Sequence, residues 1–416
     1  MKQGLKTGLT VFFLITTLLT SAQGATLTGS STTMPMFFQK TIGGEEIVQA
    51  PVYEYLRLSL SDIGLDGLSL HLSGWAKAEL HDYLPGDSKN GDLNYGYLDW
   101  HIGKRALQIR AGRQLVYMGV ASRQTDGVMV RFEKYNLGVG IVSGSPVADI
   151  GESSDGSYLT GGQIYYTLNL RKDLGGEIAI SYLSLQSQEQ PAQSLTGLNF
   201  GVRPMSGVDV SGHVYYDFYL KEIYDLSVLP VVQIWKPLKV SLRYNRTDPS
   251  ALISKTSIFS VFANSQVQQI GGGADYDILN NLNFRADYLY IDYDDYFARE
   301  YSGGFIFKYG KKNRNKVSAS IHRGDENENG YIEPRLYLKQ EIGKKFSFDA
   351  DLIFSYFDEK INDEDYSLSL GGDLSYSLHK NIKLVGAFDY TKSPISQDEY
   401  QGMLKMVYDF SGFVAE

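Results

Sequence analysis

The side chains that most often do chemistry are scattered through this sequence rather than grouped. Its six histidines show neither the H-x-x-x-H nor the H-E-x-x-H spacing with which two rings hold one metal ion. There is no cysteine, which excludes thiolate metal sites, a cysteine nucleophile and covalent haem attachment through C-x-x-C-H. No Ser–His–Asp spacing and no phosphate-binding glycine loop accompany the many aspartates. We therefore expect no catalytic site, metal or cofactor, and an enzyme with loop-borne carboxylates stays only as an alternative.

The charge of the chain limits its partners. The formal net charge is −9 and the pI is about 5.3, which gives no global reason to expect nucleic-acid binding. The acidic triplet Asp363-Glu364-Asp365 could hold Ca²⁺ or bridge lipopolysaccharide through divalent ions, but no twelve-residue calcium-loop pattern surrounds it.

The most specific polar string is Gly112-Arg113-Gln114, followed by Asp126-Gly127-Val128. These residues flank the predicted loop 114–126. An arginine and an aspartate at the two roots of one loop can form a charge-assisted pair that fixes the loop. Two interpretations stay open at this point: a charged constriction in a channel, or a plain loop-root salt bridge with no role in selectivity.

The elements that must position these residues are predicted to be β-strands. Segments 68–80, 208–219, 346–357, 368–378, 382–390 and 400–410 alternate apolar and polar side chains. In the last of them Leu404, Met406 and Tyr408 share one face, and Lys405 and Asp409 share the other. No helical periodicity persists after residue 24, so helix is not expected.

The connections between these segments alternate between short and long, as in outer-membrane barrels with periplasmic turns and external loops. We predict an all-β fold, a transmembrane antiparallel up-and-down β-barrel of about 22 strands, with about 20 as the alternative count. Its first strand, 28–39, is expected to pair with 400–410. The short turns are basic, as at Lys311-Lys312, and the long loops, which include 324–330 and 358–365, are acidic, as at Asp325-Glu326. This charge difference supports the orientation.

Strand alternation also predicts the lining of the lumen. Charges of both signs face inward, and burying so many without water would cost several kcal/mol per unpaired ion. The lumen must therefore be wet, and because large barrels are usually narrowed or plugged, we expect loops 114–126 and 245–266 to fold into it. Few residues precede Tyr53, so a plugged TonB-type transporter is not expected. The candidate lumen and constriction residues are Arg110, Arg113, Asp126, Arg131, Glu133, Arg243, Arg285 and Asp287.

The first 24 residues are typical of a secretory signal. Lys2 and Lys6 precede an apolar run from Leu9 to Leu19, and Ala22-Gln23-Gly24 offers small residues for cleavage. A membrane-anchor helix is the other interpretation, but the run is short for a span of about 20 residues. The predicted organisation is a signal peptide, 1–24, followed by one barrel, 25–416.

Three stretches resemble known families. The final strand, Tyr400 to Phe410, resembles the terminal strand of bacterial outer-membrane barrels. The Gly112-Arg113-Gln114 and Asp126-Gly127-Val128 string resembles porin-like and alginate-export-like barrels, in which the arginine and aspartate belong to a charged constriction. The run 113–147, with Tyr53-Glu54-Tyr55-Leu56, resembles barrels that surround multihaem cytochromes in porin–cytochrome conduits.

These resemblances imply a location in the bacterial outer membrane, in contact with lipids and lipopolysaccharide. They imply first a passive channel for small polar or ionic solutes. The alternative is a barrel sheath that holds multihaem cytochrome partners for electron transfer.

Overall fold

The computed structural model describes residues 25–42, 45–81, 89–103, 106–147, 156–171, 174–186, 193–248, 266–293, 295–326, 329–395 and 398–413. The predicted signal peptide lies outside these residues. No helix in this described part of the chain is long and apolar enough to cross a membrane.

The described chain consists almost entirely of antiparallel strands, with one short 3₁₀ turn at Lys311–Asn313. The strands are β1 (Thr26–Ile42), β2 (Glu45–Gln49), β3 (Pro51–Ser61), β4 (Leu68–Glu79), β5 (Lys89–Ile102), β6 (Leu107–Tyr117), β7 (Ser122–Lys134), β8 (Leu137–Pro146), β9 (Tyr158–Arg171), β10 (Leu174–Gln186), β11 (Gln193–Met205), β12 (Val208–Asp217), β13 (Glu222–Trp235), β14 (Leu238–Thr247), β15 (Val267–Leu279), β16 (Leu282–Tyr293), β17 (Phe297–Tyr309), β18 (Asn315–Glu326), β19 (Asn329–Ile342), β20 (Phe346–Ile361), β21 (Glu364–His379), β22 (Ile382–Lys392) and β23 (Asp398–Phe413).

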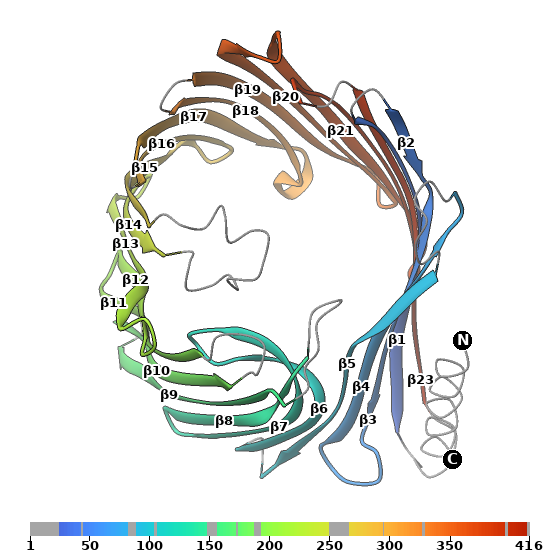
Figure 1. Ribbon diagram of the computed structural model, residues 1–416, viewed down its shortest axis with the longest axis vertical. Helices are drawn as coiled ribbons and strands as arrows, with labels where there is room; N and C mark the ends of the chain where they lie inside the picture. The colour runs from blue at the N-terminus through green and yellow to red at the C-terminus, as the bar shows by residue number, and fades with distance from the viewer. Residues whose placement is uncertain are drawn as a thin grey trace.

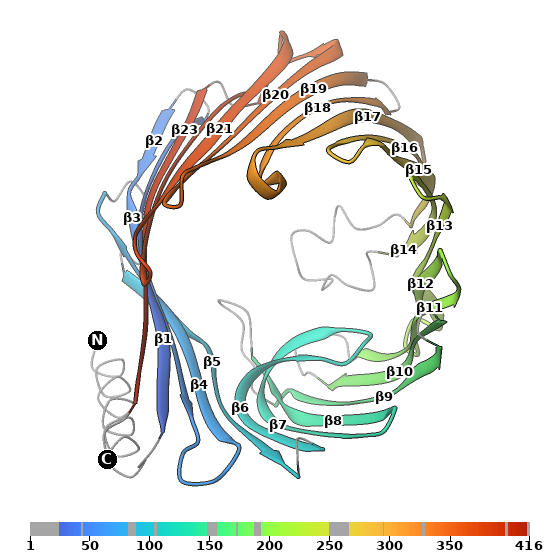
Figure 2. The same ribbon diagram turned by 180° about the vertical axis from the view of Figure 1, so that it is seen from behind.

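The sheet closes on itself through its first and last strands (Figure 1, Figure 2). β1 pairs with β23 from Thr26 opposite Phe413 to Gln39 opposite Tyr400. β1 also pairs with both β2 and β3, which are one strand interrupted at Ala50. The described strand segments therefore make a closed barrel of 22 strands, which confirms the predicted fold, strand number and closing pair.

The outer surface of the barrel is apolar. Leu404, Met406 and Tyr408 of β23 are exposed, Leu404 by 67% of its surface, while Lys405 lies on the other face of the same strand. A soluble monomer rarely leaves so extended an apolar surface open to water. A closed sheet satisfies every backbone group internally, so this surface fits the hydrocarbon region of a membrane.

Several predicted long loops are in fact paired strand. Loop 358–365 shrinks to Asn362 and Asp363, because β20 continues to Ile361 and β21 begins at Glu364. The described residues of the predicted loop 324–330 likewise belong to β18, which ends at Glu326, and to β19, which begins at Asn329. The sequence prediction was wrong here because the hydrogen bonds between strands continue beyond the membrane. Both faces of a strand are polar there, so the sequence shows no alternation from which the strand could be predicted.

A row of glycines bends the wall between β6 and β8. Gly112 lies opposite Gly127, and Gly127 lies opposite Gly144. A Cβ atom on any of the three would overlap the backbone of an adjoining strand, and Gly112 has a φ of 124° that only glycine adopts readily. The outer ends of β6 and β7 turn inward from this row and lie inside the ring of strands (Figure 1).

The glycine row can be tested by substitution. Gly112→Ala should lower the free energy of unfolding by about 1–3 kcal/mol, the cost of a strained backbone conformation. Urea unfolding of the detergent-folded barrel measures this difference. Gly402→Ala on β23 is the matched control, because a Cβ there meets open space. Equal effects of the two substitutions would contradict a special role for the row.

Candidate functional site

The inward-turned part of β6 and β7, residues Gly112–Gly127, is called the lumen hairpin below. Its underside carries Val116, Met118 and Val120, all nearly completely buried. They pack in one apolar cluster whose wall members come from six strands: Met129 of β7, Val142 of β8, Leu159 of β9, Leu183 and Leu185 of β10, Leu195 of β11 and Tyr224 of β13. On β10 these buried leucines alternate with Ile180 and Tyr182, which are exposed on the outer surface. The lumen hairpin therefore covers an apolar patch on the inner wall.

The tip of the lumen hairpin is also held by hydrogen bonds from distant strands. Tyr215 of β12 donates through Oη to the carbonyl of Gly119 at 2.9 Å. Tyr224 of β13 donates to the carbonyl of Val120 at 3.1 Å. These bonds satisfy backbone acceptors that would otherwise be buried without partners. The prediction that segment 114–126 folds into the lumen agrees with these contacts, although most of it is paired strand rather than loop.

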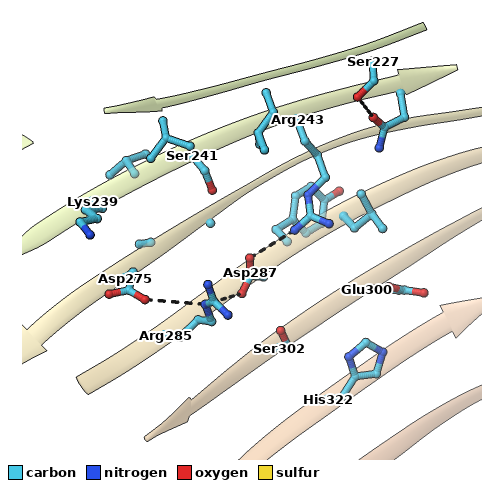
Figure 3. A pocket seen from close by; sticks show the side chains of 18 residues that line it. Ser227, Lys239, Ser241, Arg243, Asp275, Arg285, Asp287, Glu300, Ser302 and His322 are labelled. Atoms are coloured by element: carbon cyan, nitrogen blue, oxygen red, sulfur yellow. Dashed lines mark hydrogen bonds and ion pairs between the residues drawn. The ribbon is translucent and has the colours of Figure 1, made fainter. Parts of the chain in front are cut away.

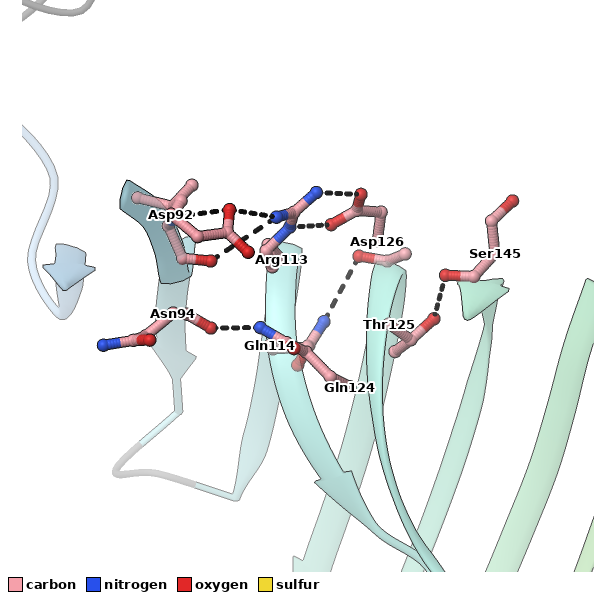
Figure 4. Close-up of polar contacts among 10 residues, drawn as sticks. Asp92, Asn94, Arg113, Gln114, Gln124, Thr125, Asp126 and Ser145 are labelled. Atoms are coloured by element: carbon pink, nitrogen blue, oxygen red, sulfur yellow. Dashed lines mark hydrogen bonds and ion pairs between the residues drawn. The ribbon is translucent and has the colours of Figure 1, made fainter. Parts of the chain in front are cut away.

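The upper face of the lumen hairpin carries charge. Arg113 donates through Nε and Nη2 to the two carboxylate oxygens of Asp126 at 2.9 and 3.0 Å. Its Nη1 lies 3.4 Å from Asp92 of β5. Arg113 and the fully buried Gln114 point to opposite sides of β6 (Figure 4). The three charged groups therefore lie on the side of the hairpin that does not contact the wall.

Two exposed apolar side chains share this upper face. Leu115 is 64% exposed and Tyr117 is 57% exposed, in contrast to Val116 between them. On the underside, Gln114 and Thr125 hold the bend: Gln114 donates to the carbonyl of Gly127 at 3.2 Å, and Thr125 donates to that of Ser145 at 2.9 Å. The hairpin, with Asp92 of β5 beside it, thus presents one arginine, two carboxylates and two apolar groups to the lumen.

Arg110 belongs to a second group, on the wall nearer the short turns. Its Nη2 donates to Asp99 of β5 at 3.0 Å, and its guanidinium lies 4.5 Å from the ring centre of Tyr97. Gln108 donates to both oxygens of Asp99 at 2.9 Å. This buried carboxylate is fully partnered, so the group stabilises the wall more than it offers free charge to a solute.

Arg131 and Glu133 lie still closer to the short turns, on the lumen face of β7. The hydroxyl of Tyr165 on β9 donates to Glu133. No contact joins these residues to Arg113 or Asp126 among the residues that the structure describes. They line the lumen at another level.

Arg243, Arg285 and Asp287 form a fourth group with Asp275, on β14 to β16 (Figure 3). Arg243 lies 3.3 Å from Asp287, and Arg285 lies 3.8 Å from each of Asp287 and Asp275. The pair of Arg243 and Asp287 reaches across β15, where Gly273 stands between Ser241 and Asp287. A Cβ on Gly273 would overlap the Asp287 carboxylate, so the missing side chain is what lets the pair form.

The eight predicted residues thus fall into separate groups on the lumen surface: Arg113 with Asp126, Arg110 alone, Arg131 with Glu133, and Arg243 with Arg285 and Asp287. Their role as a constriction stays a prediction. Sequence reasoning missed the partners Asp92, Asp99 and Asp275. Asp275 comes two residues after Gly273, the last of three consecutive glycines, and glycines hide the alternation of apolar and polar side chains. Asp92 lies beyond a register shift between β4 and β5, which reverses the alternation in β5.

Residues 249–265 lie outside the described chain, so the predicted inward fold of loop 245–266 stays a prediction. Within the described ranges, no group of three or more His, Cys, Asp or Glu side chains is arranged to hold a metal ion.

Charge on the upper face of the lumen hairpin should set ion selectivity. Arg113→Gln leaves Asp92 and Asp126 unbalanced, and one unit charge at about 4 Å in water changes the energy of a passing ion by about 1 kcal/mol. We expect a shift toward cations, of about fivefold in the permeability ratio. Reversal potentials in a KCl gradient measure it.

The reciprocal variant Asp126→Asn should shift selectivity toward anions. Lys405→Gln, which removes a lumen charge from β23, is the control and should have the smaller effect. A larger effect at Lys405 would show that the hairpin does not carry the narrowest charged passage.

No protein-family model matches the sequence, and no curated protein matches it significantly. Solved structures do resemble the fold. A ferric enterobactin receptor of Pseudomonas aeruginosa, PfeA, superposes with a TM-score of 0.59 at 10% identity, covering 94% of this chain and 81% of the receptor. The siderophore receptor PirA from the same organism superposes with a TM-score of 0.57 at 11% identity, covering 92% of this chain and 80% of the receptor.

The translocation pore of the P pilus usher, PapC, gives a TM-score of 0.50 at 8% identity, covering 92% of this chain and 99% of the pore. At these identities the likeness concerns the fold. Together with the closed sheet and its apolar outer surface, it identifies the chain as an antiparallel β-barrel of 22 strands of the kind found in Gram-negative outer membranes.

Proposed function

We propose that this chain is a passive channel for small polar and ionic solutes across the outer membrane. The observation that carries the proposal is the lumen hairpin, which covers the apolar part of the inner wall and turns charge toward the lumen. The passage is therefore lined mainly by polar and charged groups, which suits hydrated solutes and gives an apolar solute little to bind. Siderophore receptors and an usher pore share the fold, so solute passage through such a barrel is in keeping with its neighbours.

The lumen hairpin is better suited to a fixed constriction than to a lid. Lifting it would expose Val116 and Met118 together with the leucines beneath them to water. Full exposure of each such side chain costs about 1.5–3 kcal/mol. The two tyrosine hydrogen bonds add to that cost. We infer that pore size is set by the folded hairpin and not by a gating movement of it.

The alternative function, a sheath around a cytochrome, is less well supported. A sheath must keep its lumen free for its partner, whereas the lumen hairpin reaches from β6 to the inner faces of β10 to β13. We therefore keep solute passage as the function and treat the sheath as the competing outcome.

Planar-bilayer recording tests the proposal. The purified chain should give discrete, ohmic conductance steps in KCl, with both ions permeant, because both signs of charge line the lumen. A chain that inserts into the bilayer and gives no steps would overturn it. Haem absorbance in the preparation purified from its own membrane would favour the sheath.

A further inference from the structure

The lumen wall beside the hairpin tip contains a recess whose lining includes no residue of the lumen hairpin. It has a volume of about 770 Å³ and is lined by residues of β13 to β18. Ser227 of β13 lies at the edge of the recess, three residues after Tyr224, whose hydroxyl holds the hairpin tip. A solute that has passed the tip therefore meets this recess next. It is called the β14–β17 recess below, because its Lys, Arg, Asp and Glu residues lie on β14 to β17.

At the centre of the recess, Arg285 pairs only loosely with its two acidic neighbours. Arg285 is 63% exposed as a side chain, and its two carboxylate neighbours lie at 3.8 Å, beyond hydrogen-bonding distance. A guanidinium has five N–H donors in a planar fork that fits a carboxylate. Asp275, by contrast, already accepts a hydrogen bond from Asn283 at 2.7 Å. Donors of Arg285 are thus left open toward the lumen.

The two ends of the recess carry opposite charges without partners. Lys239 lies at one end and Glu300 at the other, with Arg285 and Asp287 between them (Figure 3). Neither Lys239 nor Glu300 forms a hydrogen bond or ion pair with any residue that the structure describes. The lining contains three basic residues, Lys239, Arg243 and Arg285, and three acidic residues, Asp275, Asp287 and Glu300, so a solute carrying one sign of charge would be repelled by half of them.

We propose that the β14–β17 recess binds short zwitterionic solutes, of the chemical class of di- and tripeptides. Their carboxylate would lie at Arg285 and Lys239, and their ammonium group at Glu300. The spacing supports this class: Arg285 lies opposite Gly304, so Glu300 stands four residues, or about 13 Å, farther along the wall. Both side chains reach into the recess, which leaves a gap that two or three extended residues span at about 3.5 Å each.

This inference deepens the proposed channel function and is tested with it in the same recordings. Triglycine added to an open channel should interrupt the current in a concentration-dependent way. Two analogues are the matched probes: N-acetyl-triglycine has no ammonium group, and triglycine amide has no carboxylate. Both should block more weakly, by about tenfold, because each loses one charge-assisted contact.

Two variants assign the ends of the bound peptide. Glu300→Gln should weaken block by triglycine about tenfold and leave block by N-acetyl-triglycine unchanged. Arg285→Gln should weaken block by both of these and leave block by triglycine amide unchanged. Lys308→Gln, on the same strand as Glu300 but outside the recess, is the control and should change none of the three.

Failure of the inference differs from failure of the channel function. A conducting channel that triglycine does not block, or that all three peptides block equally, overturns the recess and leaves the channel. If the chain does not conduct, calorimetric titration of triglycine into the detergent-solubilised barrel decides the matter. Binding that Glu300→Gln weakens about tenfold supports the recess, and absence of binding overturns it.

Discussion

Leu183→Asp should release the lumen hairpin and raise the single-channel conductance. Leu183 is 2% exposed on the inner wall of β10, directly in the apolar cluster beneath Val116 and Met118. A carboxylate there loses its water when the hairpin docks, and the cost without a partner is several kcal/mol. Even about 3 kcal/mol would shift the balance between docked and released hairpin by more than about a hundredfold. The barrel itself should persist, because a released hairpin lets water reach the new aspartate.

A cysteine label reports the release independently of conductance. The chain contains no cysteine, so Val120→Cys places a single thiol at the hairpin tip, where Val120 is buried. A water-soluble thiol reagent should modify it slowly in the otherwise unchanged barrel and quickly when Leu183→Asp is added. Ile306→Asp, the same kind of change on the lumen face of β17, is the control and should alter neither conductance nor labelling. Unchanged conductance with fast labelling would show that the hairpin moves without narrowing the pore.

Leu404→Arg should destabilise the whole barrel. Leu404 lies near the middle of β23 on the apolar outer surface, and it is the exposed neighbour of Gly386 on β22. A cation at the bilayer midplane costs about 2–4 kcal/mol. Reversible urea unfolding in lipid vesicles should show a loss of that size in the free energy of unfolding.

The adjacent residue provides the control for this substitution. Lys405 lies on the lumen face, so Lys405→Ala should change the free energy of unfolding by less than about 0.5 kcal/mol. Comparable losses at the two positions would contradict the assignment of outer and inner faces, and with it the lumen positions of all the candidate residues.

Much of the fold could be predicted from the sequence, for a simple physical reason. A strand between lipid and water must alternate apolar and polar side chains along its whole span, so the pattern around Leu404, Lys405 and Asp409 gives both the element and its orientation. An even number of such strands, joined by short turns and longer connections, then fixes a closed barrel. The pairing of 28–39 with 400–410 followed from that closure.

The candidate site could be predicted less completely, because its contacts are made between strands far apart in the sequence. The pair of Arg113 and Asp126 was recognisable, since both residues flank one hairpin. The apolar cluster under that hairpin was not, because Leu183 and Leu195 read as ordinary members of their strands until Val116 and Met118 are laid on them. Their apolar character on a lumen face was the available signal.

By itself, the sequence determined that the chain is a membrane barrel with charged residues on its lumen face, because side-chain alternation is a local property that the surroundings of each face impose. Only the tertiary structure decided which hairpin turns into the lumen and which charges meet. The bend at Gly112, Gly127 and Gly144 turns one hairpin inward, and the absence of a side chain at Gly273 lets Arg243 reach Asp287 across a strand. Both depend on how closely neighbouring backbones approach, which strand alternation does not encode.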